Sequence, residues 1–361
     1  MTGSEPQKKK RKGVTVRKVI TSIIGTILIA ALIATDVFLV MRWLGKKGLY
    51  DMADGSQPEV DAETAGDEWE EGDIRYDGHV YRYNDHMLTF LVMGIDSLEK
   101  LPDKEDVTDY TKGGQADTLF LVAANPDTKS MKLIAINRNS MVDVDFYDSS
   151  DNFLSTTTAQ ICLQHAYGDG LEESCERQRD TVSRMFYGLP INGYISMNMA
   201  AVPILNDSVG GVKLTVLENV PWGTDVIANG AGNEVTLEGM DAYYYLQYRD
   251  VNQFDSATQR LKRQKQYLSA FLSQTRAKTA ENISFPLSLL NDIKDYTVTD
   301  IGTSQITYLA TELLGYSVDL NNIESVQGTM AVGADEHEEY TVDQEALKKL
   351  VIETFYTRVD N

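Results

Sequence analysis

A long apolar run near the N-terminus constrains this chain more than any other feature. Residues Val19–Met41 are apolar apart from small polar residues and one aspartate, and a membrane-spanning helix needs about 20 predominantly apolar residues. A basic cluster, Lys8–Lys12, precedes the run, and Trp43 follows it where interfacial aromatic residues are found. We therefore predict a transmembrane helix over residues 19–44, with residues 1–18 as a basic cytoplasmic tail and the rest of the chain outside the membrane.

Two other interpretations of this N-terminal segment are weaker. A cleaved signal peptide has a shorter apolar core and ends at small residues, whereas Met41–Leu44, at the end of this run, includes arginine and tryptophan. The basic cluster also matches the pattern of a nuclear-localisation signal. Because an apolar run follows it closely, its role as a topology signal is favoured.

The acidic residues of the chain are concentrated after this span. The formal net charge is −21, which argues against nucleic-acid binding because that function requires a basic surface. Residues 45–80 are rich in Gly, Asp and Glu with little periodicity, which predicts an acidic, flexible stalk. Apolar runs resume at Tyr81, so residues 81–361 are expected to form one extracytoplasmic domain with a buried core.

Two apolar runs joined by a turn place charged residues near one another. Residues 118–124 and 131–136 flank the turn sequence Asn-Pro-Asp-Thr and predict a β-hairpin. Asp117 and Arg138 then lie at its open end, and Asp96 ends the preceding apolar strand. Charged residues are common at strand ends, but three of them beside buried strands make this a candidate functional site.

A later helix, expected to begin near residue 255, supplies a second group of polar residues. Arg260, Arg263 and Gln264 share one face near its N-terminus, where backbone N–H groups favour an anion. These arginines have a second interpretation, in which they solubilise an amphipathic helix and pair with nearby aspartates. Spacing alone leaves both interpretations open.

Missing motifs narrow the chemistry further. The sequence has no G-x-S-x-G, P-loop or H-E-x-x-H pattern and no convincing G-x-G-x-x-G, and its four histidines are scattered. This disfavours serine hydrolases, nucleoside triphosphatases, zinc proteases and dinucleotide enzymes. Carboxylates with few histidines suit Mg²⁺ or Mn²⁺, and arginine binds phosphate through a planar fork of donors. With Arg249 just before the helix, these residues predict a site for a diphosphate bridged by a divalent ion.

The chain has two cysteines, Cys162 and Cys175. Two are too few for a disulfide scaffold, and without histidine ligands they do not make a structural zinc site. Export of the domain predicts a Cys162–Cys175 disulfide, whereas a reducing compartment would leave two free buried thiols.

An ordered set of short motifs runs from about residue 85 to residue 356. In chain order it includes Phe90-Leu-Val-Met-Gly-Ile-Asp96-Ser, Ala116-Asp117-Thr-Leu-Phe-Leu-Val, Ile136-Asn-Arg138-Asn-Ser, His165-Ala-Tyr-Gly, Gly193-Tyr-Ile, Val209-Gly-Gly-Val, Leu237-Glu-Gly-Met-Asp-Ala, Tyr248-Arg249 and Arg260-Leu-Lys-Arg263-Gln264. Each motif alone is weak. The ordered set behind an N-terminal membrane anchor resembles the LytR-CpsA-Psr proteins of Gram-positive bacteria.

The resemblance implies a single α/β domain, with a mixed central sheet flanked by helices and a hydrophobic pocket for a polyprenyl chain. It implies transfer of a polymer, such as teichoic acid or capsule polysaccharide, from a polyprenyl-pyrophosphate carrier to peptidoglycan in the presence of Mg²⁺. Carried over to this chain, Asp96 and Asp117 bind the metal, and Asp96 is also the expected catalytic base. Residues expected to hold the pyrophosphate are Arg138, which is also catalytic, together with Arg249, Arg260, Arg263 and Gln264.

The chain departs from the family pattern where that pattern carries other residues, several of them charged. Amides stand at Gln115, Asn137, Asn139, Gln160 and Gln247. Their loss of charge keeps a second function open, in which the protein binds the lipid-linked polymer or wall glycan and regulates without catalysing transfer.

Overall fold

The computed structural model describes most of the chain, namely residues 35–52, 56–222, 225–228, 230–250, 252–253, 255–319, 323–334 and 336–360. The predicted cytoplasmic tail and most of the predicted membrane span, up to residue 34, lie outside these ranges. Residues 35–52 are helical and form the N-terminal helix of the described chain. Among the helices in these ranges, none combines the length and apolar character that a membrane crossing requires.

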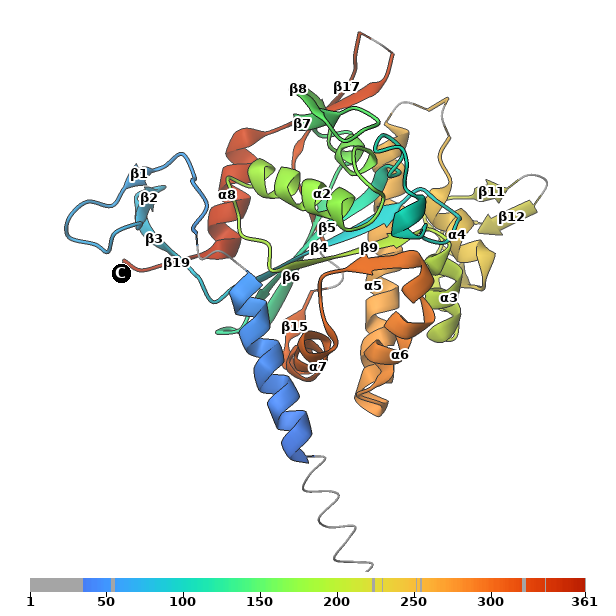
Figure 1. Cartoon of the computed structure of the whole chain (residues 1–361), viewed down its shortest axis with the longest axis horizontal. Coiled ribbons are helices and arrows are strands. Elements are labelled where there is room, and N and C mark those ends of the chain that lie inside the picture. Colours follow the sequence, from blue (N-terminus) through green and yellow to red (C-terminus); the bar gives the residue numbers. More distant parts are fainter. Residues whose placement is uncertain are drawn as a thin grey trace, which may run out of the picture.

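A mixed sheet lies at the centre of the molecule (Figure 1). Its strands follow the order β14-β9-β4-β5-β6-β15, and β16 also pairs with β6. Strand β5 runs antiparallel to its neighbours β4 and β6, β9 runs parallel to β4, and β15 and β16 run parallel to β6. The bounds are β4 Leu88–Ile95, β5 Ala116–Asn125, β6 Ser130–Ile136, β9 Gly193–Asn198, β14 Thr297–Thr299, β15 Ser317–Val318 and β16 Glu324–Ser325.

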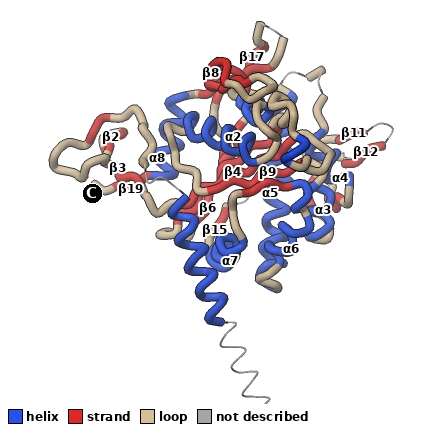
Figure 2. The backbone as a smooth tube through the Cα atoms, in the orientation of Figure 1, coloured by secondary structure: helices blue, strands red, loops and turns tan. Residues whose placement is uncertain are grey.

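The two faces of this sheet are covered by different helices, as Figure 2 shows. Side chains such as Leu91 and Leu121 pack with α2 (Glu172–Met185) and α8 (Gln344–Phe355) on one face. On the other face, Phe120 and its neighbours pack against α5 (Ser256–Glu281). Residues alternate between the faces of a strand, so continuous apolar runs are needed to bury both.

The predicted hairpin is confirmed. Strands β5 and β6 are antiparallel, with Asn125 opposite Ser130, and the Asn125 side chain accepts hydrogen bonds from the backbone N–H groups of Asp127 and Thr128 at 3.0 and 3.1 Å. The asparagine thus closes the turn as its sequence position predicts. The remaining helices are α3 (Ala201–Ser208), α4 (Met240–Gln247), α6 (Phe285–Asp292) and α7 (Thr303–Glu312), with 3-10 turns η1 (Lys104–Asp106), η2 (Ile161–Ala166), η3 (Lys294–Tyr296) and η4 (Leu313–Gly315).

Smaller sheets surround the central one. The pairs are β7 (Met141–Tyr147) with β8 (Phe153–Gln160), β10 (Val212–Thr215) with β13 (Glu234–Leu237), β11 (Val220–Trp222) with β12 (Asp225–Ala228), and β17 (Gly328–Val332) with β18 (Glu338–Val342). The β7–β8 and β17–β18 hairpins lie side by side, joined by a bridge between Ser140 and Tyr340. In Figure 1 they occupy the end of the molecule opposite the N-terminal helix.

The prediction of a flexible stalk over residues 45–80 is wrong for the described part of that segment. Residues 45–52 complete the N-terminal helix, in which Leu49 is fully buried against Leu88 and Phe90 of β4. Strands β1 (Glu63–Thr64), β2 (Ile74–Tyr76) and β3 (His79–Tyr83) then join β19 (Tyr356–Arg358) in a sheet. Most acidic side chains of this segment stay at the surface, and the buried Asp73 pairs with Arg82 at 2.8 Å, so the acidic composition does not prevent an ordered structure.

Candidate functional site

Two arginines from distant parts of the chain meet at one buried carboxylate. Arg138 follows β6 and pairs with Oδ1 of Asp117 at the start of β5, as the hairpin register predicts. Arg260 lies in the second turn of α5, and its Nη1 is 3.0 Å from Oδ2 of Asp117. Asp117 and Arg260 are only 8% and 6% exposed, so both arginines meet it away from bulk water. Buried charges are paired in this way because an isolated one is strongly destabilising.

Asp96 completes this group, which we call the Asp117 cluster: Asp96, Asp117, Arg138 and Arg260. Partial burial raises the pKa of Asp96, the negative charge of Asp117 adds to the rise, and the positive charges of Arg260 and Arg138 oppose it. Its side chain is exposed and has no hydrogen bond or ion pair to any described residue. The Asp96 carboxylate is therefore open to a ligand, whereas that of Asp117 is occupied by arginine.

The loop before Asp117 is held rigidly by a buried histidine. His165 is 1% exposed, and its Nδ1 lies 3.0 Å from the carbonyl oxygen of Gly114. Burial lowers the pKa of His165 to about 4, so the ring is neutral at physiological pH. At Gly113, a Cβ atom would lie 2.5 Å from the backbone oxygen of His165, so only glycine fits. His165 thus positions the loop and does not belong to a metal or general-base site.

The predicted disulfide is absent from the structure, in which Cys162 and Cys175 are both buried free thiols. The Cys162 sulfur accepts a hydrogen bond from Nη2 of Arg138 at 3.1 Å. The Cys175 sulfur instead lies 3.7 Å from Nε2 of His165. Each sulfur contacts a different partner, and Cys162 supports an arginine of the Asp117 cluster.

Arg249 lies near the cluster but is held by a residue that the sequence did not single out. Its Nη2 is 2.6 Å from Oε2 of Glu338 in β18, and its Nε donates to the Ser256 hydroxyl at 2.7 Å. Burial lowers the pKa of Arg260, and the positive charges of Arg138 and Arg249 add to that effect while Asp117 opposes it. Glu338 belongs to no motif, so only the folded chain brings it to the site.

Arg263 is not brought to the Asp117 cluster. This side chain is among the most deeply buried, at 1% exposure, and its Nε donates to the carbonyl oxygen of Tyr245 at 3.0 Å. Nη2 donates to the carbonyl oxygen of Tyr248, and Nη1 pairs with Glu218. We call Arg263, Glu218, Tyr245 and Tyr248 the Arg263 cluster. Its guanidinium joins α5 to α4 and its following loop, which is a structural role.

Apolar cavities extend along α5 from the Asp117 cluster. A cavity of about 120 Å³ is lined by Gly94, Thr118 and Gln264, next to the cluster, and by Phe271 further along the helix. A second cavity, of about 340 Å³, includes Leu272 and is lined almost entirely by apolar atoms of α5, α6, α7 and the sheet. Gln264 is thus placed where the polar cluster meets the apolar space.

The polar groups partly fit a divalent cation. Mg²⁺ keeps several waters and is bound by one or two carboxylates together with substrate phosphates. Asp96 is open for such a role, but both oxygens of Asp117 face arginines. No group of three His, Cys, Asp or Glu side chains suited to a metal ion occurs within the described ranges. Within the Asp117 cluster, Asp96 is therefore the carboxylate left open to a cation, and Asp117 is not.

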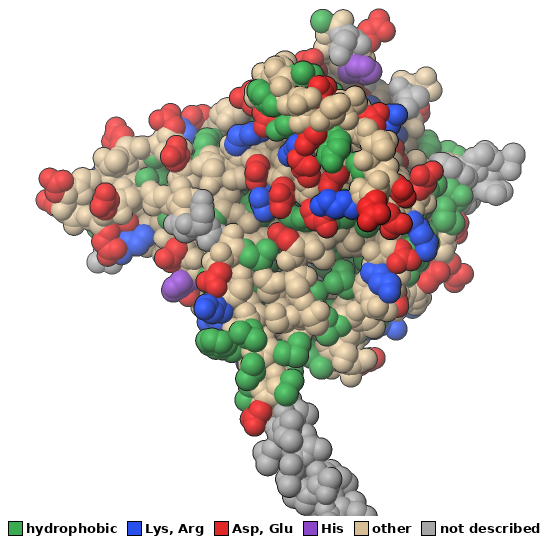
Figure 3. All heavy atoms as spheres, viewed as in Figure 1, with side chains coloured by type: hydrophobic (Ala, Val, Ile, Leu, Met, Phe, Trp, Pro, Cys, Tyr) green, Lys and Arg blue, Asp and Glu red, His purple; other side chains and the backbone are tan. Residues whose placement is uncertain are grey.

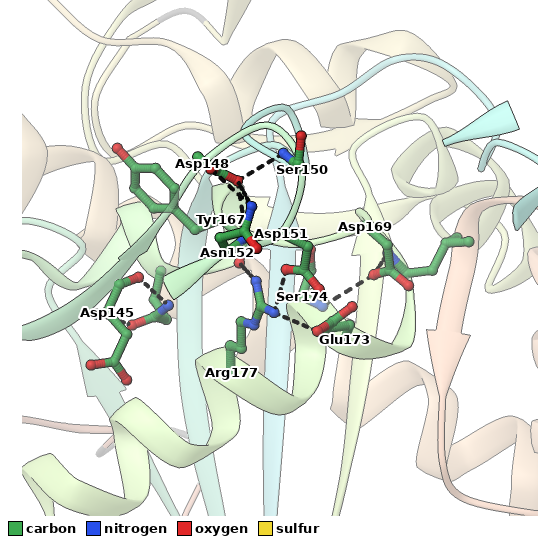
Figure 4. Close-up of polar contacts among 12 residues, drawn as sticks. Asp145, Asp148, Ser150, Asp151, Asn152, Tyr167, Asp169, Glu173, Ser174 and Arg177 are labelled. Atoms are coloured by element: carbon green, nitrogen blue, oxygen red, sulfur yellow. Dashed lines mark hydrogen bonds and ion pairs between the residues drawn. The ribbon is translucent and has the colours of Figure 1, made fainter. Parts of the chain in front are cut away.

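A second polar cluster, around Arg177 of α2, stabilises the β7–β8 hairpin (Figure 4). Arg177 donates to the carbonyl oxygen of Tyr167 at 2.9 Å and to Oδ1 of Asp151 at 2.6 Å, and it also pairs with Glu173. Its guanidinium lies 3.5 Å from the centre of the Tyr147 ring. With all of these partners inside the protein, the cluster holds the hairpin tip against α2.

The structure is thus an α/β protein with a mixed central sheet, in which two arginines meet a buried aspartate beside apolar cavities. Comparison with known families agrees with this class. Residues 54–354 match the LytR_cpsA_psr family, and the chain belongs to that family. The predicted family, α/β class and mixed central sheet are therefore confirmed.

Individual relatives are distant. The polyisoprenyl-teichoic acid–peptidoglycan teichoic acid transferase TagU of Enterococcus faecalis is 29% identical over 38% of this chain and 41% of its own length. Biofilm regulatory protein A of Streptococcus mutans is 26% identical over 66% of this chain and 55% of its own length. The alignments thus span less than two thirds of either relative. The crystal structure of TagV from B. subtilis has a TM-score of 0.56 at 21% identity, covering 74% of this chain and 97% of that one.

Proposed function

We propose that this protein transfers a phosphate-linked, anionic glycopolymer from a polyprenyl-pyrophosphate carrier to peptidoglycan. The observation that carries the proposal is the position of Arg138 and Arg260, which share a buried carboxylate beside apolar cavities. Arginine forks recognise phosphate oxygens, and an apolar cavity takes up a hydrocarbon chain. A prenyl diphosphate combines both chemistries in one molecule. The name of the E. faecalis relative supports the same substrate class.

Different residues of the site would bind the diphosphate and the prenyl chain. Arg138 and Arg260 would turn their remaining donors toward the diphosphate, and Arg249 would contribute from the side of Glu338. The Nε of Arg138 is buried and has no hydrogen-bond partner among the described residues, so it is one donor available to a ligand. Gln264 lies at the start of the apolar space, where the first prenyl unit would follow the diphosphate.

Asp96 is the best-placed proton acceptor for the transfer step. Partial burial and the nearby negative charge of Asp117 raise its pKa, and a higher pKa makes a carboxylate a better base at neutral pH. In the reaction, the acceptor hydroxyl would give its proton to Asp96 as its oxygen bonds to the polymer-linked phosphorus. The bond from that phosphorus to the lipid phosphate breaks, and prenyl phosphate leaves. Positioning and charge neutralisation by the arginines would supply most of the rate.

A bound Mg²⁺ or Mn²⁺ would neutralise part of the diphosphate charge, with Asp96 as its protein ligand and Asp117 as a second carboxylate nearby. Because Asp117 faces two arginines, its main role in the protein alone is to hold those arginines in place.

We also propose that the N-terminal segment anchors the protein in a membrane, with the domain on the outer side. The support is the basic cluster and the apolar run up to residue 41. On the described part of the helix, Val37, Val40 and Trp43 are exposed, as expected of side chains that face lipid. This arrangement would keep the cavities close to the bilayer that holds the carrier lipid.

A second function, binding of the lipid-linked polymer with a regulatory output, is favoured by two observations. Amides at Gln115, Asn139, Gln160 and Gln247 replace other residues of the family pattern, and one relative is called a biofilm regulatory protein. One of these amides contacts the Asp117 cluster, because the Gln115 side-chain oxygen accepts a hydrogen bond from Arg138.

The test is transfer by the full-length protein in detergent, supplied with a labelled prenyl-diphosphate glycan, Mg²⁺ and peptidoglycan oligomers. We expect label on the oligomers and release of prenyl phosphate, both lost in Arg138→Ala. Asp96→Asn is expected to slow transfer and to raise the Mg²⁺ concentration that is needed. Binding of the glycan lipid without any release of prenyl phosphate would instead establish the regulatory function.

A further inference from the structure

The guanidinium of Arg249 is held on two sides by other groups of the protein. Its Nη2 is 2.6 Å from Oε2 of Glu338, and its Nε donates to the Ser256 hydroxyl at 2.7 Å. Both partners are shielded from water, because Ser256 is 4% exposed and the Glu338 side chain is 12% exposed. The Nη1 of Arg249 donates to no other residue within the described ranges, and the side chain lines the same recess as Arg138. Arg249 is thus fixed in one orientation, with part of its fork free for a ligand.

Glu338 belongs to the β17–β18 hairpin. This hairpin projects from the domain at the end opposite the N-terminal helix, as the space-filling view in Figure 3 shows. Its base is anchored where β18 leads into α8, since the backbone N–H of Asp343 donates to the carbonyl oxygen of Gln327 at 2.9 Å. The Tyr340 hydroxyl also donates to the carbonyl oxygen of Val326 at 2.9 Å. Glu338 is the first residue of β18, so its carboxylate is positioned by an anchored strand.

Two of the amides at which the chain departs from the family pattern also bond to Glu338. Nδ2 of Asn139 donates to Oε2 of Glu338 at 3.4 Å, and the Gln160 side chain donates to the backbone carbonyl oxygen of Glu338 at 2.7 Å. These amides therefore do more than leave out a charge. They contact a residue that brings a negative charge to the site from a distant part of the chain.

The arginines of the site are held together by carboxylates although their charges repel one another. Burial lowers the pKa of Arg260, and the positive charges of Arg138 and Arg249 lower it further, against the opposing charge of Asp117. Asp117 pairs with two of these arginines, and Glu338 pairs with the third. Without Glu338, the long side chain of Arg249 would have to be ordered when a ligand binds, and such ordering reduces affinity.

We propose that Glu338 is a positioning residue, which orients Arg249 for the diphosphate and makes the β17–β18 hairpin part of the functional site. The inference rests on the proposed function, which supplies the ligand of Arg249. Glu338 itself touches no substrate and acts only through the arginine. Its removal should therefore weaken binding only while Arg249 is present.

The test is a double-mutant cycle on the binding of a prenyl diphosphate that carries no sugar, measured with full-length protein in detergent. Glu338→Gln is expected to weaken binding about fivefold, because Arg249 must then be ordered when the ligand binds. Arg249→Ala is expected to weaken binding about tenfold. The double variant should bind within about twofold of Arg249→Ala, since Glu338 then has no arginine to orient. A general loss of folding would instead persist without Arg249, so the cycle separates positioning from stability.

The loss of a negative charge is controlled in two ways. All affinities are measured at about 0.5 M salt, where the Debye length is about 4 Å. Glu339→Gln removes the same charge from the neighbouring residue and should leave binding unchanged. Ser256→Ala removes the second partner of Arg249 and should weaken binding about twofold, again only while Arg249 is present.

The role of Glu338 is overturned if Glu338→Gln binds the lipid as tightly as the unmodified protein or more tightly, or if its effect adds in full to that of Arg249→Ala. Normal binding by Arg249→Ala, with binding weakened in Arg138→Ala, also overturns it and leaves the proposed function standing. Unchanged binding in Arg138→Ala would contradict the proposed function itself.

Discussion

Arg260 and Arg263 lie one turn apart on α5, yet they belong to different parts of the protein. Arg260 reaches across to Asp117 at the edge of the central sheet. Arg263 turns to the carbonyl oxygens of Tyr245 and Tyr248 and to Glu218. The Asp117 cluster has an open carboxylate, Asp96, and a cavity beside it. In the Arg263 cluster, the arginine is instead bonded to other groups of the protein. Equal spacing on a helix therefore does not imply equal function, because the packing partners decide what each side chain does.

The largest expected effect is on stability in the Arg263 cluster. Arg263→Ala should lower the free energy of unfolding by about 3 kcal/mol, because it leaves two carbonyl oxygens and a carboxylate without their buried partner. Chemical denaturation of the full-length protein measures the change. Lys262→Ala, an exposed neighbour on the same helix, should stay within about 0.5 kcal/mol of the unmodified protein. If Arg263→Ala lowers the free energy of unfolding by less than about 1 kcal/mol, the Arg263 cluster does not stabilise the fold.

A smaller and opposite effect is expected at Asp96. Its pKa is raised in the folded protein, so the charged carboxylate costs stability at pH values above that pKa. Asp96→Asn should therefore stabilise the domain at pH 7, by a few tenths of a kcal/mol because water screens the exposed side chain. The gain should disappear as the pH falls through the pKa of Asp96, where the carboxylate becomes protonated. Thermal unfolding between pH 4 and pH 8 measures it, with the exposed Asp103→Asn as control.

If Asp96→Asn stabilises the domain equally at all pH values, or destabilises it at pH 7, the raised pKa of Asp96 is contradicted. A functional residue that costs stability is common at sites where charge is held for a ligand.

Local pattern predicted the hairpin and its charged end correctly. The turn after Asn125 fixes the register of β5 and β6, and the register alone brings Asp117 to Arg138. Only two strands and one turn are involved, so the sequence contains the necessary information. The α5 helix was predicted for the same reason, since its apolar positions repeat with the helical period.

The remaining parts of the site depend on contacts between distant segments. Glu338 reaches Arg249 across 89 positions of the chain. The two cysteines lie in η2 and α2, where their sulfurs face Arg138 and His165, so sequence separation did not predict their partners. The stalk was mispredicted because β19, near the C-terminus, pairs with β3 and completes its sheet. These contacts join segments that are far apart in the sequence, so the local pattern of residues does not predict them.

The difference between the Asp117 cluster and the Arg263 cluster is tested most directly by the affinity of full-length protein for a sugar-free prenyl diphosphate. Arg138→Ala and Arg260→Ala should each weaken binding by about 1.5–3 kcal/mol, which is roughly tenfold or more. Arg263→Lys, measured where it remains folded, should bind within about twofold of the unmodified protein, as should Lys262→Ala. This result would place the diphosphate at the Asp117 cluster. Equal losses for Arg260 and Arg263, or for Arg260 and Lys262, would contradict the account and indicate diffuse electrostatic attraction along α5.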